Sequence, residues 1–205
     1  MLVTIEGIDG SGKSSLVTSL GHLLADLSPV ITREPGSTWV GDQVRRAVAE
    51  RADPVTEALL FAADHAAHIS TLIRPSLREG RLVISDRYSD SRYAYQQETL
   101  RESVAYPLAW LRALHAGWTI PPDLTFLIVL PVDAALSRMA SGREREHFEN
   151  HELLSRVQEN YLALVQEDPS RFVMVDGLKG EGEIADFVSG VIRDVSGQSR
   201  SHRRP

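Results

Sequence analysis

The sequence predicts a three-layer α/β fold, in which a five-stranded parallel sheet carries helices on both faces. Two observations favour this fold. Short apolar runs rich in β-branched residues alternate along the chain with longer segments whose apolar residues recur at helical spacing. Each helical segment then connects two strands, and such crossovers make consecutive strands parallel. At 205 residues, 42% of them hydrophobic, the chain can bury a sizeable core.

The first elements are assigned from residue type and spacing. Residues 2–5 are apolar and β-branched, as in a buried strand, and leucines recur at helical spacing from Leu16 to Leu27 after a glycine-rich loop. Residues 29–32 form a short apolar run that predicts the second strand. The spacing of the apolar residues that follow predicts a helix over 39–50.

A long helix is predicted to begin after Asp53. Aspartate is a favourable N-cap, and Pro54 suits the first turn, where the missing N–H of proline is no loss. Alanines and leucines continue the helical pattern to Leu72 or Leu77, with a disturbance expected near Pro75.

The rest of the chain continues the alternation. Strands are predicted over 81–85, 124–130 and 171–175, and helices over 89–97, 100–115, 132–139, 151–167 and 183–195. No repeat and no long linker divides the sequence, so we expect one domain over 1–195. The polar residues 196–205 are expected to form a fraying C-terminal tail.

The stretch from Gly7 to Ser14 matches the phosphate-binding pattern G-x-x-x-x-G-K-[ST]. It lies between a predicted strand and a predicted helix, a context that a chance glycine-rich turn would lack. Its glycines let several N–H groups point inward, and the helix N-terminus adds a positive dipole end. We expect Lys13 to reach the β- and γ-phosphates of a nucleoside triphosphate, and the Ser14 hydroxyl to hold Mg²⁺. The residues expected to bind the nucleotide are Gly7, Ile8, Asp9, Gly10, Ser11, Gly12, Lys13, Ser14 and Ser15.

Two charged pairs directly follow other predicted strands, at Arg33-Glu34 and Asp86-Arg87. In open parallel sheets, ligands bind beyond the carboxyl ends of the strands, so these pairs should lie at the same edge as the loop. Asp86 can then hold Mg²⁺ opposite Ser14, with a surface salt bridge as the alternative. Arg33 and Arg87 suit a second phosphate, and two facing anion sites favour phosphoryl transfer between two phosphates.

The charged residues 141–149 have two interpretations. They form either a solvated turn or a lid that brings an arginine over the triphosphate and excludes water. The variable positions of the glycine-rich loop, Ile8 to Ser11, carry no basic residue. Extra positive charge must come from another part of the chain, which favours the lid.

Composition excludes several classes of function. The net charge of −6 argues against a general nucleic-acid or membrane-surface binder. The chain has no cysteine, which excludes disulfides, thiolate metal sites and thiol nucleophiles. The longest apolar run, 124–132, is too short to span a bilayer, and residues 1–10 show no secretion signal. We therefore expect a cytoplasmic protein.

Several stretches, taken together, resemble the thymidylate kinase family of nucleoside monophosphate kinases, and their arrangement is similar to that of archaeal members. In chain order these stretches are Glu6–Ser14, Thr32–Gly36, Leu60–Asp64, Asp86–Ser91, Ala94–Gln96 and Pro122–Phe126. The resemblance covers nearly the whole chain. It implies a P-loop kinase fold with a lid, a homodimer, and phosphorylation of dTMP to dTDP that depends on ATP and Mg²⁺.

The resemblance also implies roles for single residues. Asp9 would lie between donor and acceptor, and Arg33 and Arg87 would hold the monophosphate. Arg143 or Arg145 would be the lid arginine. The catalytic residues on this view are Asp9, Lys13, Arg87, Arg143 and Arg145.

The same resemblance implies contacts with the sugar and the base. Phe61 would stack on the pyrimidine, and Tyr95 would crowd the 2′ position of the sugar and so favour deoxyribose. The edge of the base would be reached by Ser91, Arg92 or Gln96. The family usually has an arginine that hydrogen-bonds the base carbonyl where this chain has His65. We expect His65 to donate in its place, directly or through water, or Arg92 to replace it.

Two other functions are weighed against this one. A kinase for another or modified pyrimidine nucleoside monophosphate would share the same motifs. A nucleotide-binding switch protein is disfavoured, because guanine selectivity usually needs an Asn-Lys-x-Asp stretch that this chain lacks. A switch would also need no second phosphate site.

Overall fold

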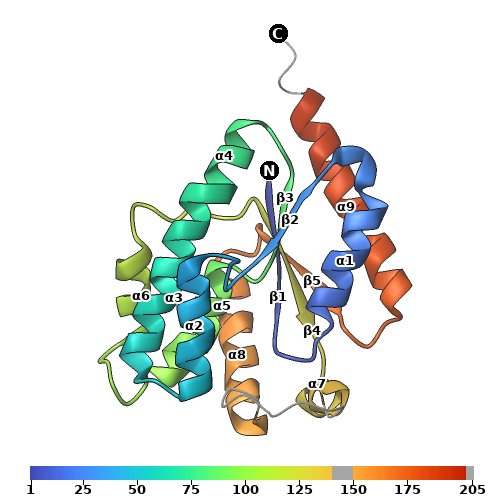
Figure 1. The fold of residues 1–205 in the computed structure, drawn as a ribbon. Coiled ribbons are helices and arrows are strands. Elements are labelled where there is room, and N and C mark those ends of the chain that lie inside the picture. Colours follow the sequence, from blue (N-terminus) through green and yellow to red (C-terminus); the bar gives the residue numbers. More distant parts are fainter. Residues whose placement is uncertain (140–149, 202–205) are drawn as a thin grey trace.

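The computed structural model describes residues 1–139 and 150–201 of the chain (Figure 1). Within these residues, five strands form one parallel sheet in the order β2-β3-β1-β4-β5. The strands are β1 (Leu2–Gly7), β2 (Val30–Arg33), β3 (Val83–Asp86), β4 (Leu124–Val129) and β5 (Phe172–Asp176). The predicted five-stranded parallel sheet is therefore confirmed.

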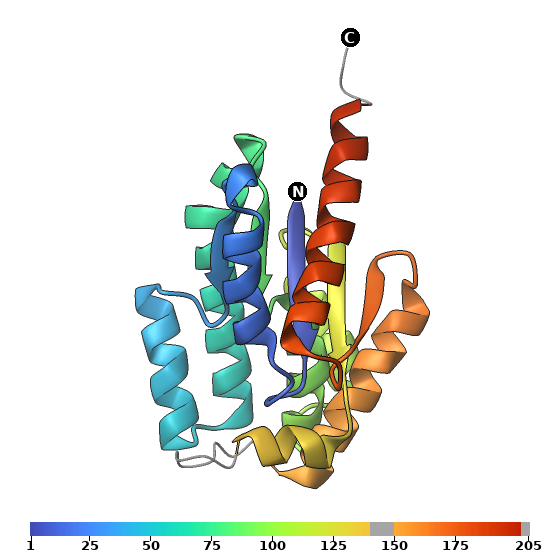
Figure 2. The same ribbon diagram turned by 90° about the vertical axis from the view of Figure 1, so that its right-hand side faces the viewer.

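Helices lie on both faces of this sheet, as predicted (Figures 1 and 2). In chain order they are α1 (Lys13–Leu23), η1 (Ala25–Leu27), α2 (Trp39–Glu50), α3 (Pro54–His68), η2 (Ile69–Ile73), α4 (Arg74–Arg78), α5 (Ser89–Thr99), α6 (Pro107–His115), α7 (Val132–Met139), α8 (His151–Glu167) and α9 (Glu181–Ser201). One face is covered by α1 and α9, which pack against each other. The opposite face is covered by η2, α5 and α8.

Apolar side chains of the sheet point into two cores. Toward α1 and α9, the fully buried Ile5 and Phe126 belong to one cluster with Leu20. Toward α5 and α8, Leu127 belongs to a second cluster with the fully buried Tyr161. Because strands buried on both faces are held firmly on each side, their carboxyl ends form a rigid platform.

The register of the strands brings three sequence-distant segments to one edge of the sheet. Asp86, the last residue of β3, is level with Ile5 of β1 and with Arg33 of β2. The glycine-rich loop leaves β1 immediately beyond this level. The loop, Arg33 and Asp86 therefore meet at the carboxyl edge, as the sequence pattern predicts.

The long helix agrees with its prediction, since it continues past His68 through the π-helical turn η2 and α4, and the disturbance falls just before Pro75, whose missing N–H disfavours regular helix. Two elements differ from the sequence prediction. Helix α6 begins at Pro107 rather than earlier, because Tyr106 has a left-handed backbone with φ 56°. Helix α9 runs to Ser201, so part of the expected tail is helical, and no proline interrupts it.

Asp53 caps α3 as predicted, since its Oδ1 accepts hydrogen bonds from the N–H groups of Val55 and Thr56 at 3.0 and 3.1 Å. We expect Asp53→Ala to lower the free energy of unfolding by about 1 kcal/mol, because both donors lose this partner. Urea-induced unfolding measures the change. Asp53→Asn keeps an accepting oxygen and should lose less; equal losses for the two variants would contradict the cap.

Candidate active site

The glycine-rich loop makes a tight turn between β1 and α1. Gly7 and Gly10 have positive φ angles of 144° and 78°. A Cβ atom on Gly7 would lie 2.6 Å from the carbonyl oxygen of Ile128, and one on Gly10 would lie 2.2 Å from that of Ala135. Only glycine fits both positions, so close packing against β4 and α7 fixes the curl of the loop.

Lys13, the first residue of α1, is the cation of this loop. Its side chain is largely buried, and its Nζ donates to the carbonyl oxygen of Ile8 at 2.8 Å. Burial, and then the nearby charge of Arg87, lower the pKa of Lys13 from its ordinary value to about 8, although neighbouring carboxylates oppose the shift. At pH 7 the ammonium is therefore still mostly protonated, and it can neutralise phosphate charge.

Ser14 and Asp86 meet at the start of α1 and the end of β3. The Ser14 Oγ donates to Asp86 Oδ2 at 2.6 Å. A hydroxyl and a carboxylate are hard oxygen ligands of the kind that Mg²⁺ prefers, and phosphate oxygens and water can complete the octahedron. These two residues therefore fit the predicted metal ion.

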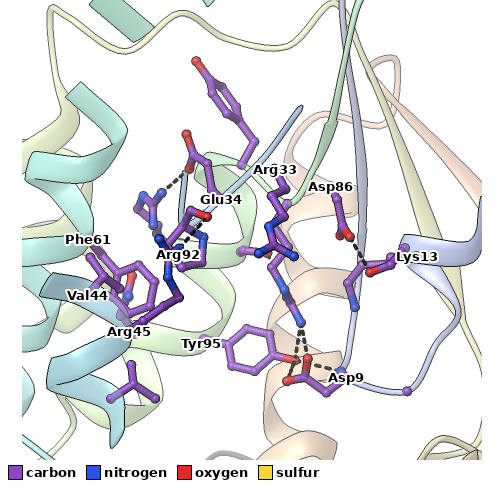
Figure 3. Close-up of a pocket in the computed structure, with 18 of the residues that line it drawn as sticks. Asp9, Lys13, Arg33, Glu34, Val44, Arg45, Phe61, Asp86, Arg92 and Tyr95 are labelled. Carbon is purple, nitrogen blue, oxygen red and sulfur yellow. Dashed lines mark hydrogen bonds and ion pairs between the residues drawn. The ribbon is translucent and has the colours of Figure 1, made fainter. Parts of the chain in front are cut away.

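A pocket of about 870 Å³ extends from the loop along the carboxyl edge of the sheet (Figure 3). The structure brings residues from the loop after β1 and from β2, β3, α1, α2, α3, α5 and α7 into its wall, and the first three of these are the places that the sequence-based grouping joins. The predicted site residues that line it are Asp9, Gly10, Gly12, Lys13, Ser14, Ser15, Arg33, Phe61, Asp86, Arg87, Ser91, Arg92, Tyr95 and Gln96.

Asp9, Arg87 and Tyr95 form a connected group in the wall of the pocket. Arg87 donates to Asp9 Oδ1 at 2.5 Å, and the Tyr95 hydroxyl donates to Asp9 Oδ2 at 2.9 Å. Burial would raise the pKa of Asp9, but the charges of Arg87 and Lys13 outweigh it and lower the pKa to about 2. Asp9 is therefore an anion that holds Arg87 beside the loop.

Arg33 enters the same pocket from the end of β2 (Figure 3). Its side chain is exposed and makes no hydrogen bond or ion pair with any other residue that the structure describes. Within the described part of the chain, the pocket thus holds an unpaired guanidinium from Arg33 and one from Arg87 whose ion pair is with Asp9. A phosphate dianion is a suitable ligand for two such forks.

Ser91 lines the pocket, but its hydroxyl is engaged behind the wall. Ser91 Oγ donates to Glu6 Oε2 at 2.5 Å and accepts from Arg87 at 3.0 Å. The Tyr161 hydroxyl donates to the same Glu6 oxygen at 2.9 Å. Burial, and then the charge of Asp90, raise the pKa of Glu6 to about 7. The structure therefore connects Ser91 to the orientation of Arg87 rather than to an open edge of the pocket.

The sequence model of a family described as thymidylate kinase matches residues 5–188 of the chain. The chain belongs to the thymidylate kinase family. Three similar archaeal proteins are each named "Probable thymidylate kinase". The protein of Methanoculleus marisnigri is 62% identical over 205 residues, which span 100% of this chain and 99% of that protein. The protein of Methanospirillum hungatei is 61% identical over 94% of each chain, and that of Methanocorpusculum labreanum is 50% identical over 97% of this chain and 100% of its own length.

In this member of the thymidylate kinase family, His65 does not lie in the pocket wall, contrary to the expected contact with the base. Its side chain is fully buried, and its Nδ1 lies 2.7 Å from Glu34 Oε1. Its ring packs against those of Tyr88 and Trp118, at centroid distances of 4.5 and 5.4 Å. The imidazole therefore supports Glu34, which does line the pocket, and not a ligand.

Sequence reasoning missed several residues that the fold brings to the pocket, and two predicted residues lie outside the described part of this chain. The missed residues include Val44, Arg45, Val48 and Arg138, while the sequence pattern places Glu34 at this edge and indicates no role for it. Nothing in the local pattern of the missed residues separates them from ordinary positions of a helix. Arg143 and Arg145, the predicted lid arginines, fall in 140–149, which the structure does not describe.

A second pocket, of about 370 Å³, opens on the other side of the glycine-rich loop. It is lined by Gly12 and Ser15 of the loop and α1, and by Gly177 beyond the end of β5. Arg138 of α7 lines both pockets, and its guanidinium donates to the Gly177 carbonyl oxygen at 2.8 Å.

Within the residues that the structure describes, no helix has the length and apolar character needed to cross a bilayer.

We expect Glu6→Gln to change how the stability of this family member depends on pH. The pKa of Glu6 in the folded protein, about 7, is above its ordinary value of 4.5. The stability that protonated Glu6 contributes is therefore fully present below pH 4.5 and is lost as the pH rises through about 7. The amide of the variant does not titrate, so the wild type should lose stability relative to the variant across this window.

The measurement is the free energy of unfolding in urea for both proteins, taken at intervals between pH 5 and pH 8. Glu57, whose pKa burial and the charge of Asp53 raise to about 7, is present in both proteins and contributes equally. Parallel pH profiles for wild type and variant would contradict a protonated Glu6.

Proposed function

We propose that this protein transfers the γ-phosphoryl group of ATP to dTMP, giving ADP and dTDP, in the presence of Mg²⁺. The observation that carries the proposal is a single pocket that gathers the cations that two phosphates need. Lys13 and the loop amides line it from the start of α1, Arg33 and Arg87 line it from the ends of β2 and β3, and Asp9 pairs with Arg87. Membership of the thymidylate kinase family supports the choice of dTMP.

On the donor side, the triphosphate would bind along the loop from Gly7 to Ser15, with Lys13 on its β- and γ-phosphates. The second pocket continues from this loop and has space for the base of ATP. Arg138 reaches both pockets and would lie against the bound nucleotide. Ser14 and Asp86 would hold Mg²⁺, which supplies charge neutralisation on the phosphate oxygens when it is bound.

On the acceptor side, Arg33 and Arg87 would hold the monophosphate and Phe61 would stack on the base. The Tyr95 hydroxyl, which also accepts from the Asp9 N–H at 2.9 Å, would lie beneath the sugar and exclude a 2′-hydroxyl. The lid, residues 141–149, would add Arg143 or Arg145 over the reacting phosphates. We place all of these functions in one domain over residues 1–195.

The chemistry needs positioning more than a base. An oxygen of the acceptor phosphate, already anionic, bonds to the γ-phosphorus of ATP while the bond from that phosphorus to the β,γ-bridging oxygen breaks. Negative charge spreads over the equatorial oxygens as the two phosphates approach. Lys13 and Arg87 are held by neighbouring groups before the ligands arrive, so they can stabilise this charge without reorganising.

We also propose that the protein is cytoplasmic and acts as a homodimer that packs through helices on one side of the sheet. Trp39 of α2 and Leu59 of α3 are 77% and 47% exposed, and these two helices pack side by side. Exposed large apolar side chains on neighbouring helices suit an interface between copies. Light scattering of the purified protein distinguishes a dimer from a monomer.

Assays with ATP, Mg²⁺ and each of dTMP, dUMP, dCMP and UMP test the proposed reaction. We expect ADP and dTDP to form fastest with dTMP, because the pocket combines a stacking ring with two guanidinium groups for the phosphate. No turnover of any of these nucleotides would contradict the kinase. Preference for another or a modified pyrimidine would favour the alternative substrate.

Lys13→Met tests the role of the loop cation. We expect kcat to fall by about 10²- to 10³-fold, because one preorganised charge on the transferred phosphoryl group is lost. The far-UV circular dichroism spectrum should not change. Arg46→Met removes an exposed cation of α2 whose ion pair is with Glu50, and it should keep the wild-type kcat. Normal turnover by Lys13→Met would remove Lys13 from the mechanism.

A further inference from the structure

The backbone of Arg87 adopts a conformation that is rare for residues other than glycine. Its φ angle is 68°, in the left-handed region, in the turn between β3 and α5. Such a conformation is costly for a residue with a Cβ atom, and it persists only where neighbouring groups hold it. Arg87 lines the pocket and is one of the two cations proposed for the acceptor phosphate. The groups that hold this turn therefore also place its guanidinium.

Hydrogen bonds on both sides of Arg87 hold the turn. The Arg87 N–H donates to the carbonyl oxygen of Ile5 at 3.0 Å, and the Arg87 carbonyl oxygen accepts from the Ser85 hydroxyl at 2.7 Å. The next N–H along the chain, that of Tyr88, donates to Glu6 Oε1 at 2.8 Å. Glu6 thus ties the residue after Arg87 to the end of β1.

The other oxygen of Glu6 reaches the guanidinium of Arg87 through Ser91. Ser91 Oγ lies 2.5 Å from Glu6 Oε2 and accepts from Arg87 Nη1 at 3.0 Å. Glu6 is fully buried and Ser91 is 8% exposed, so water competes little for these contacts. One carboxyl group therefore acts on Arg87 by two routes, through the backbone at Tyr88 and through the side chain at Ser91.

Tyr161 of α8 completes a triangle of oxygen atoms with Glu6 and Ser91. Its hydroxyl lies 2.9 Å from Glu6 Oε2 and 2.8 Å from Ser91 Oγ. With Glu6 ionised, both hydroxyls donate to its Oε2, and the contact between the two hydroxyls then lacks a hydrogen. A proton on Glu6 Oε2 supplies it, so that each oxygen donates to one neighbour and accepts from the other. Burial, and then the charge of Asp90, raise the pKa of Glu6 to about 7, which favours the same neutral form.

We propose that Glu6 is the positioning residue of Arg87, and that it acts through the Tyr88 N–H and the Ser91 hydroxyl while Tyr161 keeps its carboxyl group in place. This inference rests on the proposed function, because it concerns the contact of Arg87 with the acceptor phosphate. Glu6 does not line the pocket and so touches no ligand itself. Its loss should weaken the phosphate contact and leave the contacts with the sugar and the base intact.

Binding of dTMP and of thymidine to the purified full chain tests the proposal. The two ligands differ only in the 5′-phosphate, so the ratio of their Kd values isolates the phosphate contact. Glu6→Leu keeps the approximate size of the side chain and removes both oxygen atoms. We expect the Kd for dTMP to rise by about tenfold or more and that for thymidine to stay within about twofold of the wild-type value. Calorimetry measures dTMP directly and thymidine by its competition with dTMP.

Steady-state kinetics give a second readout, which a loss of folded protein would not reproduce. In Glu6→Leu the KM for dTMP should rise while the KM for ATP stays at the wild-type value, because Lys13 and the glycine-rich loop keep their places. Glu6→Gln should restore most of the KM for dTMP, since its amide oxygen can accept from the Tyr88 N–H and its amide nitrogen can donate to a hydroxyl. Tyr161→Phe removes one corner of the triangle and should raise this KM by less than Glu6→Leu.

Thr4→Val is the matched control. Thr4 lies two residues before Glu6 on β1, and its hydroxyl shares a buried hydrogen bond with that of Thr125 at 2.8 Å. It is fully buried and does not line the pocket. Its substitution should leave the Kd values of dTMP and thymidine unchanged. A rise in the Kd for dTMP in Thr4→Val as large as in Glu6→Leu would overturn the inference, because any lost polar contact within β1 would then have the same effect.

The outcomes separate this inference from the proposed function. A wild type that phosphorylates dTMP, together with an unchanged ratio of Kd values in Glu6→Leu, would overturn the inference and leave the kinase in place. Equal losses for dTMP and thymidine would also overturn it, by reducing Glu6 to a general structural role. A wild type that neither phosphorylates nor binds dTMP would overturn both.

Glu6→Asp keeps the proposal testable if Glu6→Leu does not fold. It retains a carboxyl group and withdraws it by one methylene, away from the Tyr88 N–H and the Ser91 hydroxyl. We expect the Kd for dTMP to rise while that for thymidine does not. A wild-type ratio in Glu6→Asp would remove Glu6 from the positioning of Arg87.

Discussion

The parallel register of β2, β3 and β1 is the constraint on which the site depends. Asp86 is level with both Arg33 and Ile5, so the carboxylate of Asp86, the guanidinium of Arg33 and the start of the glycine-rich loop reach the same edge. A slip of one residue would turn Asp86 to the other face of the sheet, away from Ser14. The two buried cores that clamp this sheet from both sides prevent such a slip.

Charges at this edge are arranged in pairs that prepare the pocket for anions. Asp9 and Arg87 hold each other, Lys13 is held by a backbone carbonyl, and Arg33 has no partner among the described residues. Because these groups are oriented before any ligand arrives, a bound phosphate gains attraction without a large cost of reorganisation. A second layer, Glu6 with Ser91, orients Arg87 in turn.

The thymidylate kinase family defines the general plan of this chain, while the buried cluster of Glu34, His65, His68 and Arg92 shows how one member supports the wall of its pocket. His65 is turned inward and supports the carboxylate of Glu34, so it does not line the pocket. Arg92 on α5 places its guanidinium in the pocket wall. Burying a carboxylate is favourable only when donors surround it, and this one is surrounded by three. The buried charge of Glu34 is therefore stabilised only while these partners remain in place.

The sequence by itself determined the strands, the glycine-rich loop, the cap at Asp53 and the edge at which Arg33 and Asp86 meet, because these depend on local pattern and on the parallel rule. Only the tertiary structure decided which way His65 points, what holds Ser91, that Glu6 stands behind the pocket, and which donors surround Glu34 in its wall. Those contacts join residues far apart in the chain, such as Glu34 with Arg92 and Glu6 with Tyr161. Whether a side chain faces a ligand or another side chain depends on which buried partners lie within reach, and no local pattern contains that information.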